Sequence, residues 1–501
     1  MSLLPTLLLP FLLAQAQAVP GRLVVVNDVT DPVSLDPHRE FDASSDNIVN
    51  QIFDGLVRLD PQGRIIPGLA ESWRRVDELT MEFSLRRNVS FHNGEPFNAE
   101  AVKFSLKRQL DARHPAPNAG LIRSILSVDI VDEHTVRLKT KEPDGILLNK
   151  LPMFFKIVPP RYIAQVGDDG FALHPMGTGP FRFIRWDHGR EIEIEANPSY
   201  WMPGAPRVQR LIFRFLPMNR QLDALLAGEV DMITDLSGLD TMKVVRNPDT
   251  KILKSADLYA VTLIPNSRRG PFADLRVRQA LPYAIDAGAL IRYAAKGNGR
   301  RLSTLSAPGQ FGHNPQIRSP EANPRKAASL LRAAGFNKGP KIRMLVREEI
   351  LQFGLVIAAQ LRRVGMEVDM RTASQEQVFQ EVVRPNLDAS LPPWEGDLLV
   401  SHFVDPTAHS YFPYMIFVHS QGPYSLARDA DFDALFERMI RTLNSQEQEK
   451  VCFRLAELVQ NKGLAYSPVQ VIRSFALRRK LHYEPQIAGM LDFRTAGWEE
   501  P

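Results

Sequence analysis

The sequence predicts an α/β protein with more than one domain. Short apolar runs typical of buried strands alternate with amphipathic runs typical of helices. The clearest case is residues 341–372, where a strand pattern, a helix pattern and a second strand pattern form one βαβ unit. The chain has 501 residues, of which 44% are hydrophobic and 24% are charged. This ordinary composition, together with the length, allows a large core in two or more domains.

The charge pattern argues against a nucleic-acid partner. The formal net charge is +4, and the basic residues come mostly as scattered pairs such as Arg74-Arg75 and Arg478-Arg479. A nucleic-acid-binding surface usually combines a basic stripe with stacking aromatic residues. We therefore interpret these pairs as solvated surface and expect no nucleic-acid partner.

Residues 1–18 have the pattern of a cleavable signal peptide. They are uncharged and Leu-rich, and two prolines interrupt a run that is too short to span a bilayer. Small residues close the run, so we expect cleavage between Ala18 and Val19. No Lys or Arg follows Met1, which leaves open a start further upstream. No cysteine follows the run, so we expect a protein that is free in the periplasm, not a lipoprotein.

Residues 48–97 hold the densest set of strand and turn signals. A helix-like run ends near Gly55, and a short strand pattern follows at 56–59. The next turn is Asp60-Pro61-Gln62-Gly63, in which Pro presets φ and Gly can take a positive φ. A second turn, His92-Asn93-Gly94, follows the alternating strand pattern at 81–85.

Several sequence blocks in this stretch, together with others downstream, carry a family resemblance. The blocks are Asp54-Gly55-Leu56, Pro67-Gly68-Leu69-Ala70-Glu71-Ser72-Trp73, Phe83-Ser84-Leu85-Arg86 and Phe91-His92-Asn93-Gly94-Glu95-Pro96-Phe97. With them, the chain resembles the family 5 extracytoplasmic solute-binding proteins of ABC transporters, which include dipeptide-, oligopeptide- and nickel-binding proteins. The resemblance implies a two-lobed periplasmic binding protein fold, of class II and cluster C type, with an extra inserted subdomain.

The resemblance also implies how the chain is divided. After the signal peptide, lobe I would be discontinuous and an inserted subdomain would interrupt it. The expected ranges are 19–47, 176–269 and 476–501 for lobe I, 48–175 for the inserted subdomain and 270–475 for lobe II.

Two positions before residue 120 are candidate ligand contacts. The two-proline loop at 31–37 resembles the family loop that runs along the ligand cleft, and Phe41 follows it. The alternative for the segment after this loop is that it caps the next helix. Arg113 comes after a helix pattern at 98–110, for which Asn98 is the expected cap. It matches an arginine that reaches the ligand in nickel-binding relatives, and a solvated arginine at a helix end is the alternative.

Two further candidates lie between residues 150 and 181. Phe154 stands in a segment that often carries a second ligand arginine in the nickel-binding proteins. Its apolar side chain counts against nickel and indicates either a pocket wall or core. Thr178 lies in the sequence Gly177-Thr178-Gly179, which resembles the family's return crossing between lobes. The two glycines allow close backbone approach, and the spacing is not that of a phosphate-binding loop.

The last candidates lie between residues 388 and 405. Peptide-binding relatives have a Trp and, three residues later, an Asp that holds the α-ammonium group of the peptide. Trp394 and Asp397 have this spacing, and an ordinary turn carboxylate is the alternative for Asp397. The second possible alignment places Leu399 and His402 at these positions.

Catalytic and metal-binding patterns are weak in this sequence. His402, His409 and His419 are close in sequence, but Asp405-Pro406 interrupts any shared helical face, so scattered loop histidines are the better interpretation. No serine-hydrolase elbow, zinc-protease motif or paired-cysteine spacing is present. The single cysteine, Cys452, lies in an amphipathic helix pattern and is expected to be buried and inert.

The resulting hypothesis is a binding protein without cofactor, metal or catalytic activity. It would capture a short peptide or a peptide-like solute in an interlobe cleft and deliver it, as a monomer, to the permease subunits of an ABC importer. A nickel or metallophore carrier of the same family is the alternative, and an enzyme on the same scaffold is a third possibility.

Overall fold

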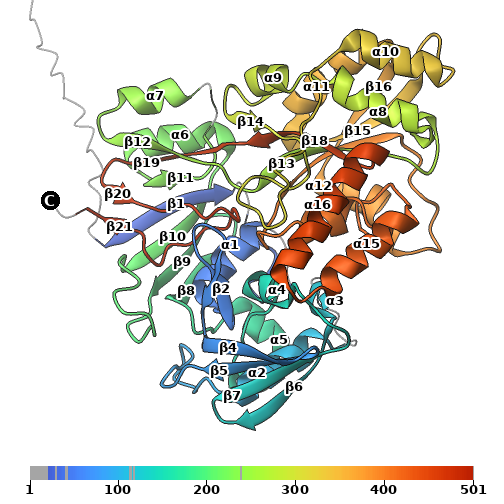
Figure 1. Cartoon of the computed structure of the whole chain (residues 1–501). Coiled ribbons are helices and arrows are strands. Elements are labelled where there is room, and N and C mark those ends of the chain that lie inside the picture. The colour runs from blue at the N-terminus through green and yellow to red at the C-terminus, as the bar shows by residue number, and fades with distance from the viewer. Residues whose placement is uncertain are drawn as a thin grey trace, which may run out of the picture.

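The computed structural model describes most of the chain after the N-terminal segment. The described residues are 21–28, 31–39, 43–111, 116, 119–236, 238 and 240–499. The expected signal peptide and the candidate contacts Phe41 and Arg113 lie outside them. Figure 1 shows lobe I with its sheet at the left, the inserted subdomain at the bottom and lobe II at the upper right.

Lobe I is built on a seven-stranded sheet that combines N-terminal, central and C-terminal segments. In spatial order its strands are β12 (Thr250–Ser255), β19 (Arg473–Arg478), β11 (Met232–Ile233), β1 (Arg22–Asp28), β10 (Arg210–Phe215), β9 (Glu191–Ala196) and β8 (Phe181–Asp187). Its helices are α1 (Ala43–Ile52), α6 (Met218–Ala227) and α7 (Thr241–Arg246). Side chains of β1 are buried on both faces: Leu23 and Val25 enter one core cluster and Val24 enters another. Burial on both faces explains why this strand reads as a continuous apolar run.

The inserted subdomain has a separate antiparallel sheet. Its strand order is β4 (Ala70–Asp77), β5 (Thr80–Leu85), β7 (Thr135–Thr140) and β6 (Ile125–Asp132). The subdomain also contains the pair β2 (Val57–Leu59) and β3 (Ile65–Pro67), and the helices α2 (Ala99–Gln109), α3 (Ala119–Ile122), α4 (Leu147–Phe154) and α5 (Pro160–Leu173). Asn98 caps α2 as predicted, because its side chain accepts a hydrogen bond from the Glu100 N–H at 3.1 Å.

Lobe II is built on a six-stranded mixed sheet. Its strand order is β14 (Gly299–Arg301), β18 (Tyr466–Val471), β13 (Tyr259–Pro265), β17 (Leu398–Val404), β15 (Lys341–Arg347) and β16 (Glu367–Ala373). Its helices are α8 (Leu275–Ala284), α9 (Ala287–Ala289), α10 (Pro324–Ala333), α11 (Leu351–Arg363), α12 (Gln375–Val378), α13 (Arg384–Leu387), α14 (Tyr411–Phe417), α15 (Ala430–Arg441) and α16 (Ser445–Lys462). The predicted βαβ unit is confirmed as β15, α11 and β16, with the two strands parallel. Pro282 does not end α8, which continues to Ala284.

The chain passes between the two large sheets through very short connections. Residues 256–258 join β12 of lobe I to β13 of lobe II, and Ile472 joins β18 of lobe II to β19 of lobe I. Because β13 pairs with β17 and β18, it belongs to the sheet of lobe II. Lobe II therefore begins before the expected boundary at residue 270.

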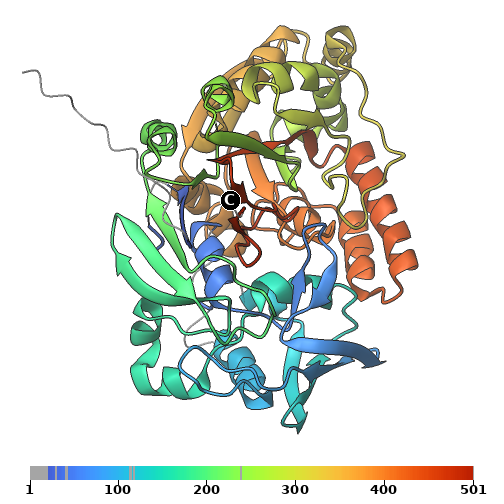
Figure 2. The same cartoon turned by 90° about the vertical axis from the view of Figure 1, so that its left-hand side faces the viewer.

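The C-terminal segment after β19 packs between the lobes. In Figure 2 this dark-red segment lies in the middle of the molecule. It contains the short pair β20 (Leu481–His482) and β21 (Gly497–Trp498). The Leu258 N–H of the first connection donates to the Ile487 carbonyl at 2.8 Å, and the Leu491 N–H donates to the Asn47 side chain of α1 at 2.8 Å. The segment therefore ties both lobes together beside their connections.

The glycines at 177 and 179 lie where lobe I meets the inserted subdomain. A Cβ atom at Gly177 would be 2.0 Å from the Ile52 carbonyl oxygen, and one at Gly179 would be 2.5 Å from the Ile52 carbonyl carbon. Their lack of a side chain therefore allows the close backbone approach that the sequence indicated.

Candidate interlobe ligand site

The strand directions bring one edge of each large sheet together. In lobe II, β15 is parallel to both β16 and β17, so their carboxyl ends lie at one edge, where β13 begins. In lobe I, β1 is parallel to β10 and β11, so their carboxyl ends also share an edge, where β19 begins. The short connections join these two edges, which we call the inner edges. Ligands of open α/β sheets bind outside the carboxyl ends of strands, so this is the candidate site.

The inner edge of lobe II contains a buried arginine with a carboxylate partner. Arg347, the last residue of β15, donates from Nη2 to Glu349 Oε1 at 2.8 Å and from Nε to Glu349 Oε2 at 3.0 Å. It also donates to Gln375, just after β16, at 3.2 Å. Burial acts to raise the pKa of Glu349, but its contacts with His402 and Arg347 outweigh burial and lower that pKa. Glu349 is thus an ionised group that already has its counter-charge.

His402, near the end of β17, has unmet hydrogen-bonding capacity. Neither ring nitrogen is accessible to solvent, and neither has a hydrogen-bond partner among the described residues. Glu349 lies beside the ring, with 3.9 Å between Nε2 and Oε2, which is too long for a direct hydrogen bond but close enough for each group to shift the pKa of the other. Burial lowers the pKa of His402, so the ring is neutral, with one donor and one acceptor. A buried polar group without a partner is costly, and a ligand that supplies one would be favoured.

Asp235 contributes a carboxylate from lobe I. It follows β11, and its side chain is accessible to solvent although protein atoms surround it. Partial burial raises the pKa of Asp235. The positive charge of Arg473 acts in the opposite direction but does not cancel this shift. Burial raises the pKa of Tyr259, at the start of β13, and the charges of Asp235 and Glu349 raise it further. Tyr259 therefore interacts with a carboxylate from each lobe, Asp235 of lobe I and Glu349 of lobe II.

The connections themselves are held by a buried ion pair. Arg473, the first residue of β19, donates from Nε to Asp257 Oδ2 at 2.6 Å, and Asp257 is fully buried. The Gln470 side chain donates to the Asp257 carbonyl at 2.5 Å. Both crossing segments are thus bonded to each other, which fixes the inner edges side by side.

Thr178 lies away from the inner edges, in the buried junction below lobe I. Its hydroxyl donates to Asp54 Oδ2 at 3.3 Å. Asp54 also accepts from the Tyr200 hydroxyl at 3.2 Å and from the Trp201 indole at 3.0 Å. These bonds give the Asp54-Gly55-Leu56 block a structural explanation.

Phe154 is a core residue. It is buried at the end of α4, and its ring stacks on that of Phe412 with 6.4 Å between centroids. The structure thus places Phe154 in the core, and its role as a pocket wall stays a prediction.

Trp394 and Asp397 lie at the opposite end of β17 from His402. The Asp397 carboxylate is buried, accepts the Arg343 N–H at 2.8 Å and lies 3.5 Å from its guanidinium Nε. A Cβ atom at Gly270 would be 2.4 Å from Asp397 Oδ1. The Trp394 ring covers Gly396. Asp397 thus has protein partners at this outer edge, and the amine contact inferred from its spacing stays a prediction.

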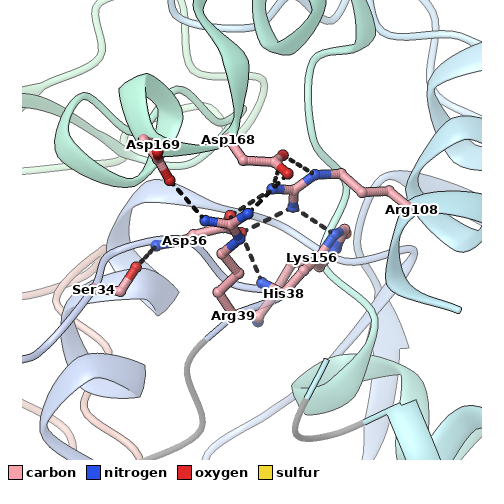
Figure 3. Close-up of polar contacts among 8 residues, drawn as sticks. All are labelled: Ser34, Asp36, His38, Arg39, Arg108, Lys156, Asp168 and Asp169. Atoms are coloured by element: carbon pink, nitrogen blue, oxygen red, sulfur yellow. Dashed lines mark hydrogen bonds and ion pairs between the residues drawn. The ribbon is translucent and has the colours of Figure 1, made fainter. Parts of the chain in front are cut away.

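A charged cluster joins the loop after β1 to the inserted subdomain. Figure 3 shows Arg108 of α2 between Asp36 and Asp168, with Nη1 2.9 Å from Asp36 Oδ1 and Nη2 2.8 Å from Asp168 Oδ1. Arg39 also contacts Asp168, at 2.9 Å. The cluster borders a cavity of about 340 Å³. Arg108 and Asp168 belong to the inserted subdomain, and Asp36 and Arg39 belong to lobe I. Because the ion pairs join these two parts of the structure, we interpret the cluster as a contact that holds lobe I and the subdomain together.

A cavity within lobe II is remote from the inner edges. Its volume is about 540 Å³, and it is bordered by Tyr466 at the amino end of β18, by Tyr414 and by the end of α16. The strand β18 reaches the connection at its other end, Val471.

The described residues show neither a metal-ligand cluster nor a membrane-spanning helix. They contain no group of three or more His, Cys, Asp or Glu side chains placed to hold a metal ion. None of their helices has the length and apolarity needed to cross a membrane. Cys452 is buried as predicted, and burial raises the pKa of its thiol to about 12.

Comparisons with known proteins agree with the fold. The chain is 29% identical over 433 residues to di/tripeptide-binding protein 1 of Pseudomonas aeruginosa, covering 79% of this chain and 80% of that protein. It is 27% identical over 481 residues to heme-binding protein A of Haemophilus influenzae, covering 89% of this chain and 86% of that protein. Among solved structures, the ABC transporter-associated periplasmic binding protein DppA of Helicobacter pylori, in complex with the peptide STSA, matches with a TM-score of 0.82 and 23% identity, covering 96% and 98% of the two chains.

A second structural match has a different ligand. NikZ of Campylobacter jejuni, in complex with Ni(L-His), has a TM-score of 0.81 and 19% identity, with 94% of this chain and 98% of that chain covered. These matches confirm the two-lobed periplasmic binding protein fold. The family description "bacterial extracellular solute-binding proteins, family 5 Middle" matches residues 64–411, which is more than half of the chain. The chain belongs to family 5 of the bacterial extracellular solute-binding proteins.

Proposed function

We propose that this protein captures a short peptide or peptide-like solute between its lobes and delivers it to the permease of an ABC importer. It would work outside the cytoplasm, as a monomer and without catalysis. The ligand would enter between the inner edges and contact both lobes. The closed state would become favoured because it makes contacts that the open state lacks.

The observation that carries this proposal is the state of His402. Its two buried ring nitrogens need one acceptor and one donor, and the described residues supply neither. A peptide group supplies both, because it carries a carbonyl oxygen and an N–H. The similarity to a di/tripeptide-binding protein over most of the chain supports the same ligand class.

Nickel is the second candidate ligand, since an unpaired histidine is also a metal ligand and the NikZ structure holds Ni(L-His). Against it stands the apolar core at Phe154, where the nickel-binding relatives were expected to place an arginine.

Native mass spectrometry of the protein, purified without denaturation, tests the proposal. The same sample is measured again after denaturation, and trialanine is added in a third measurement. A small organic adduct that is lost on denaturation, together with a trialanine adduct, supports the proposal. An adduct with the isotope pattern of nickel, or failure to bind trialanine in the absence of any organic adduct, contradicts it.

A further inference from the structure

We propose that Asp235 of lobe I holds the α-ammonium group of the ligand, an inference that rests on the proposed peptide-binding function. The cationic end of the ligand would thus lie against lobe I, and its backbone would extend towards His402 of lobe II. Both groups lie at the inner edges and interact with Tyr259: the His402 ring packs edge-on against it, with 5.3 Å between centroids, and the charge of Asp235 raises the pKa of its hydroxyl.

The first argument is that other carboxylates at these strand ends already have partners. Asp31 accepts the Trp186 indole N–H at 3.1 Å and the Gly189 N–H at 3.0 Å. Asp257 is paired with Arg473, and Glu349 is paired with Arg347.

Asp405, directly after β17, is also satisfied. Its Oδ1 accepts the Thr407 N–H at 2.8 Å, and its Oδ2 accepts the His409 N–H at 3.0 Å. A ligand ammonium would have to share any of these four carboxylates with the donors that each already holds.

Asp235 differs from these four. No hydrogen bond or ion pair joins its carboxylate to another residue that the structure describes. Its side chain remains accessible, although the surrounding protein raises its pKa. A carboxylate that is partly desolvated and unpaired gains most from a cationic partner.

The neighbouring groups favour an ammonium at this position. Arg473 is the nearby cation, but its guanidinium is held by Asp257 and by the Gly489 carbonyl, to which Nη2 donates at 2.6 Å. The charge of Asp235 also raises the pKa of the Tyr259 hydroxyl, so an ammonium group at Asp235 would lower that pKa again. On the lobe II side, His402 is neutral and the Glu349 carboxylate is already paired with Arg347, so Asp235 offers the stronger attraction for an ammonium and orients the ligand.

The test uses isothermal titration calorimetry with two probes, trialanine and N-acetyl-trialanine, at pH 7. Acetylation removes the positive charge but keeps the peptide groups. We expect the wild-type protein to bind trialanine at least about tenfold more tightly than the acetylated probe. We expect Asp235→Asn to weaken trialanine binding about 30-fold and to leave the affinity for the acetylated probe unchanged.

The matched control is Asp223→Asn, which neutralises an exposed carboxylate on α6 of the same lobe. It should bind both probes as the wild-type protein does. If Asp235→Asn binds trialanine as tightly as the wild-type protein, the inference is overturned while the proposed function stands. If the wild-type protein binds neither probe, the proposed function is overturned, and the inference with it.

Discussion

The polar atoms at the two ends of strand β17 are shielded from solvent, but they differ in whether they have hydrogen-bond partners. At the outer end, the Asp397 carboxylate accepts a backbone N–H and lies beside the Arg343 guanidinium. At the inner end, His402 has two buried ring nitrogens without partners among the described residues. The comparison shows that burial of a polar residue does not by itself indicate a ligand site. Unmet hydrogen-bonding capacity at an edge between lobes is the more informative feature.

Other buried histidines extend the comparison to acidic pH. The largest expected effect of all is a loss of stability there. Burial lowers the pKa of His38, His92 and His409 to about 4 in each case. Each of these rings has partners for both nitrogens, unlike His402; for His409 they are the Tyr411 N–H at 2.9 Å and Gln448 Oε1 at 3.3 Å.

Because these histidines stay neutral in the folded protein, the unfolded chain binds more protons between pH 6.5 and 4. The free energy of unfolding should therefore fall as the pH falls through this range, by about 3 kcal/mol for each fully buried ring. Asp405 acts in the opposite direction, because burial raises its pKa to about 6. The expected net loss is roughly 5 kcal/mol. Urea denaturation at pH 7, 6, 5 and 4 measures it, and constant stability across this range would contradict the assignment of neutral rings.

Removal of the Asp397 carboxylate tests the outer end. Asp397→Ala should lower the free energy of unfolding by about 2–3 kcal/mol, because a buried N–H and a guanidinium lose their acceptor. Ligand affinity should stay within about twofold of the wild-type value, since the residue lies away from the inner edges. Denaturation and calorimetry measure the two quantities, with exposed Asp388→Ala as control. A large loss of affinity at unchanged stability would restore the predicted amine contact.

The close packing of Gly270 against Asp397 gives an effect of similar size with a matched control. Both Gly270 and Gly94 have positive φ values, +63° and +85°. A Cβ atom would meet Asp397 at Gly270 but nothing within 4 Å at Gly94. Backbone strain at a positive φ costs about 1 kcal/mol, so Gly94→Ala should lose about that amount. Gly270 also has ψ −161°, a region essentially restricted to glycine, so Gly270→Ala should lose about 3 kcal/mol from strain and the carboxylate contact together. Equal losses in thermal or urea denaturation would contradict this close packing.

Replacement of His402 should produce the smallest change in stability and a clear change in binding. His402→Leu removes two unpaired buried nitrogens, so the free energy of unfolding should stay constant or rise by about 1 kcal/mol. Affinity for a peptide ligand should fall about tenfold, because one hydrogen-bonded contact is lost. His409→Leu is the control. This variant should be destabilised, because the Tyr411 N–H and the Gln448 side chain lose their hydrogen bonds to the ring. A strongly destabilised His402→Leu protein with normal affinity would contradict the assignment.

The sequence predicted the fold where local signals and close contacts agree. The glycines around Thr178, the cap at Asn98 and the βαβ unit at 341–372 each depend on a few neighbouring residues. The predicted boundary of lobe II, residue 270, lies after β13. The sequence of a buried strand does not show which of two sheets it joins, so β13 was assigned to lobe I.

The site was harder to predict, because it depends on which strand ends face each other. Trp394 and Asp397 have the spacing of a peptide contact, but three-dimensional pairing puts them at the outer edge. Asp235 and Glu349 were not among the predicted site residues. The available signal was their position directly after buried strand patterns, where parallel strands end.

The central claim is that the inner edges of both lobes form the ligand site. The most direct test is to measure backbone amide hydrogen exchange with and without trialanine. Added ligand should slow exchange together in residues 231–236, 258–262, 347–351 and 400–405, which come from both lobes. Slowed exchange confined to residues 394–397, or to the segments around the lobe II cavity at Tyr414 and Tyr466, would contradict it.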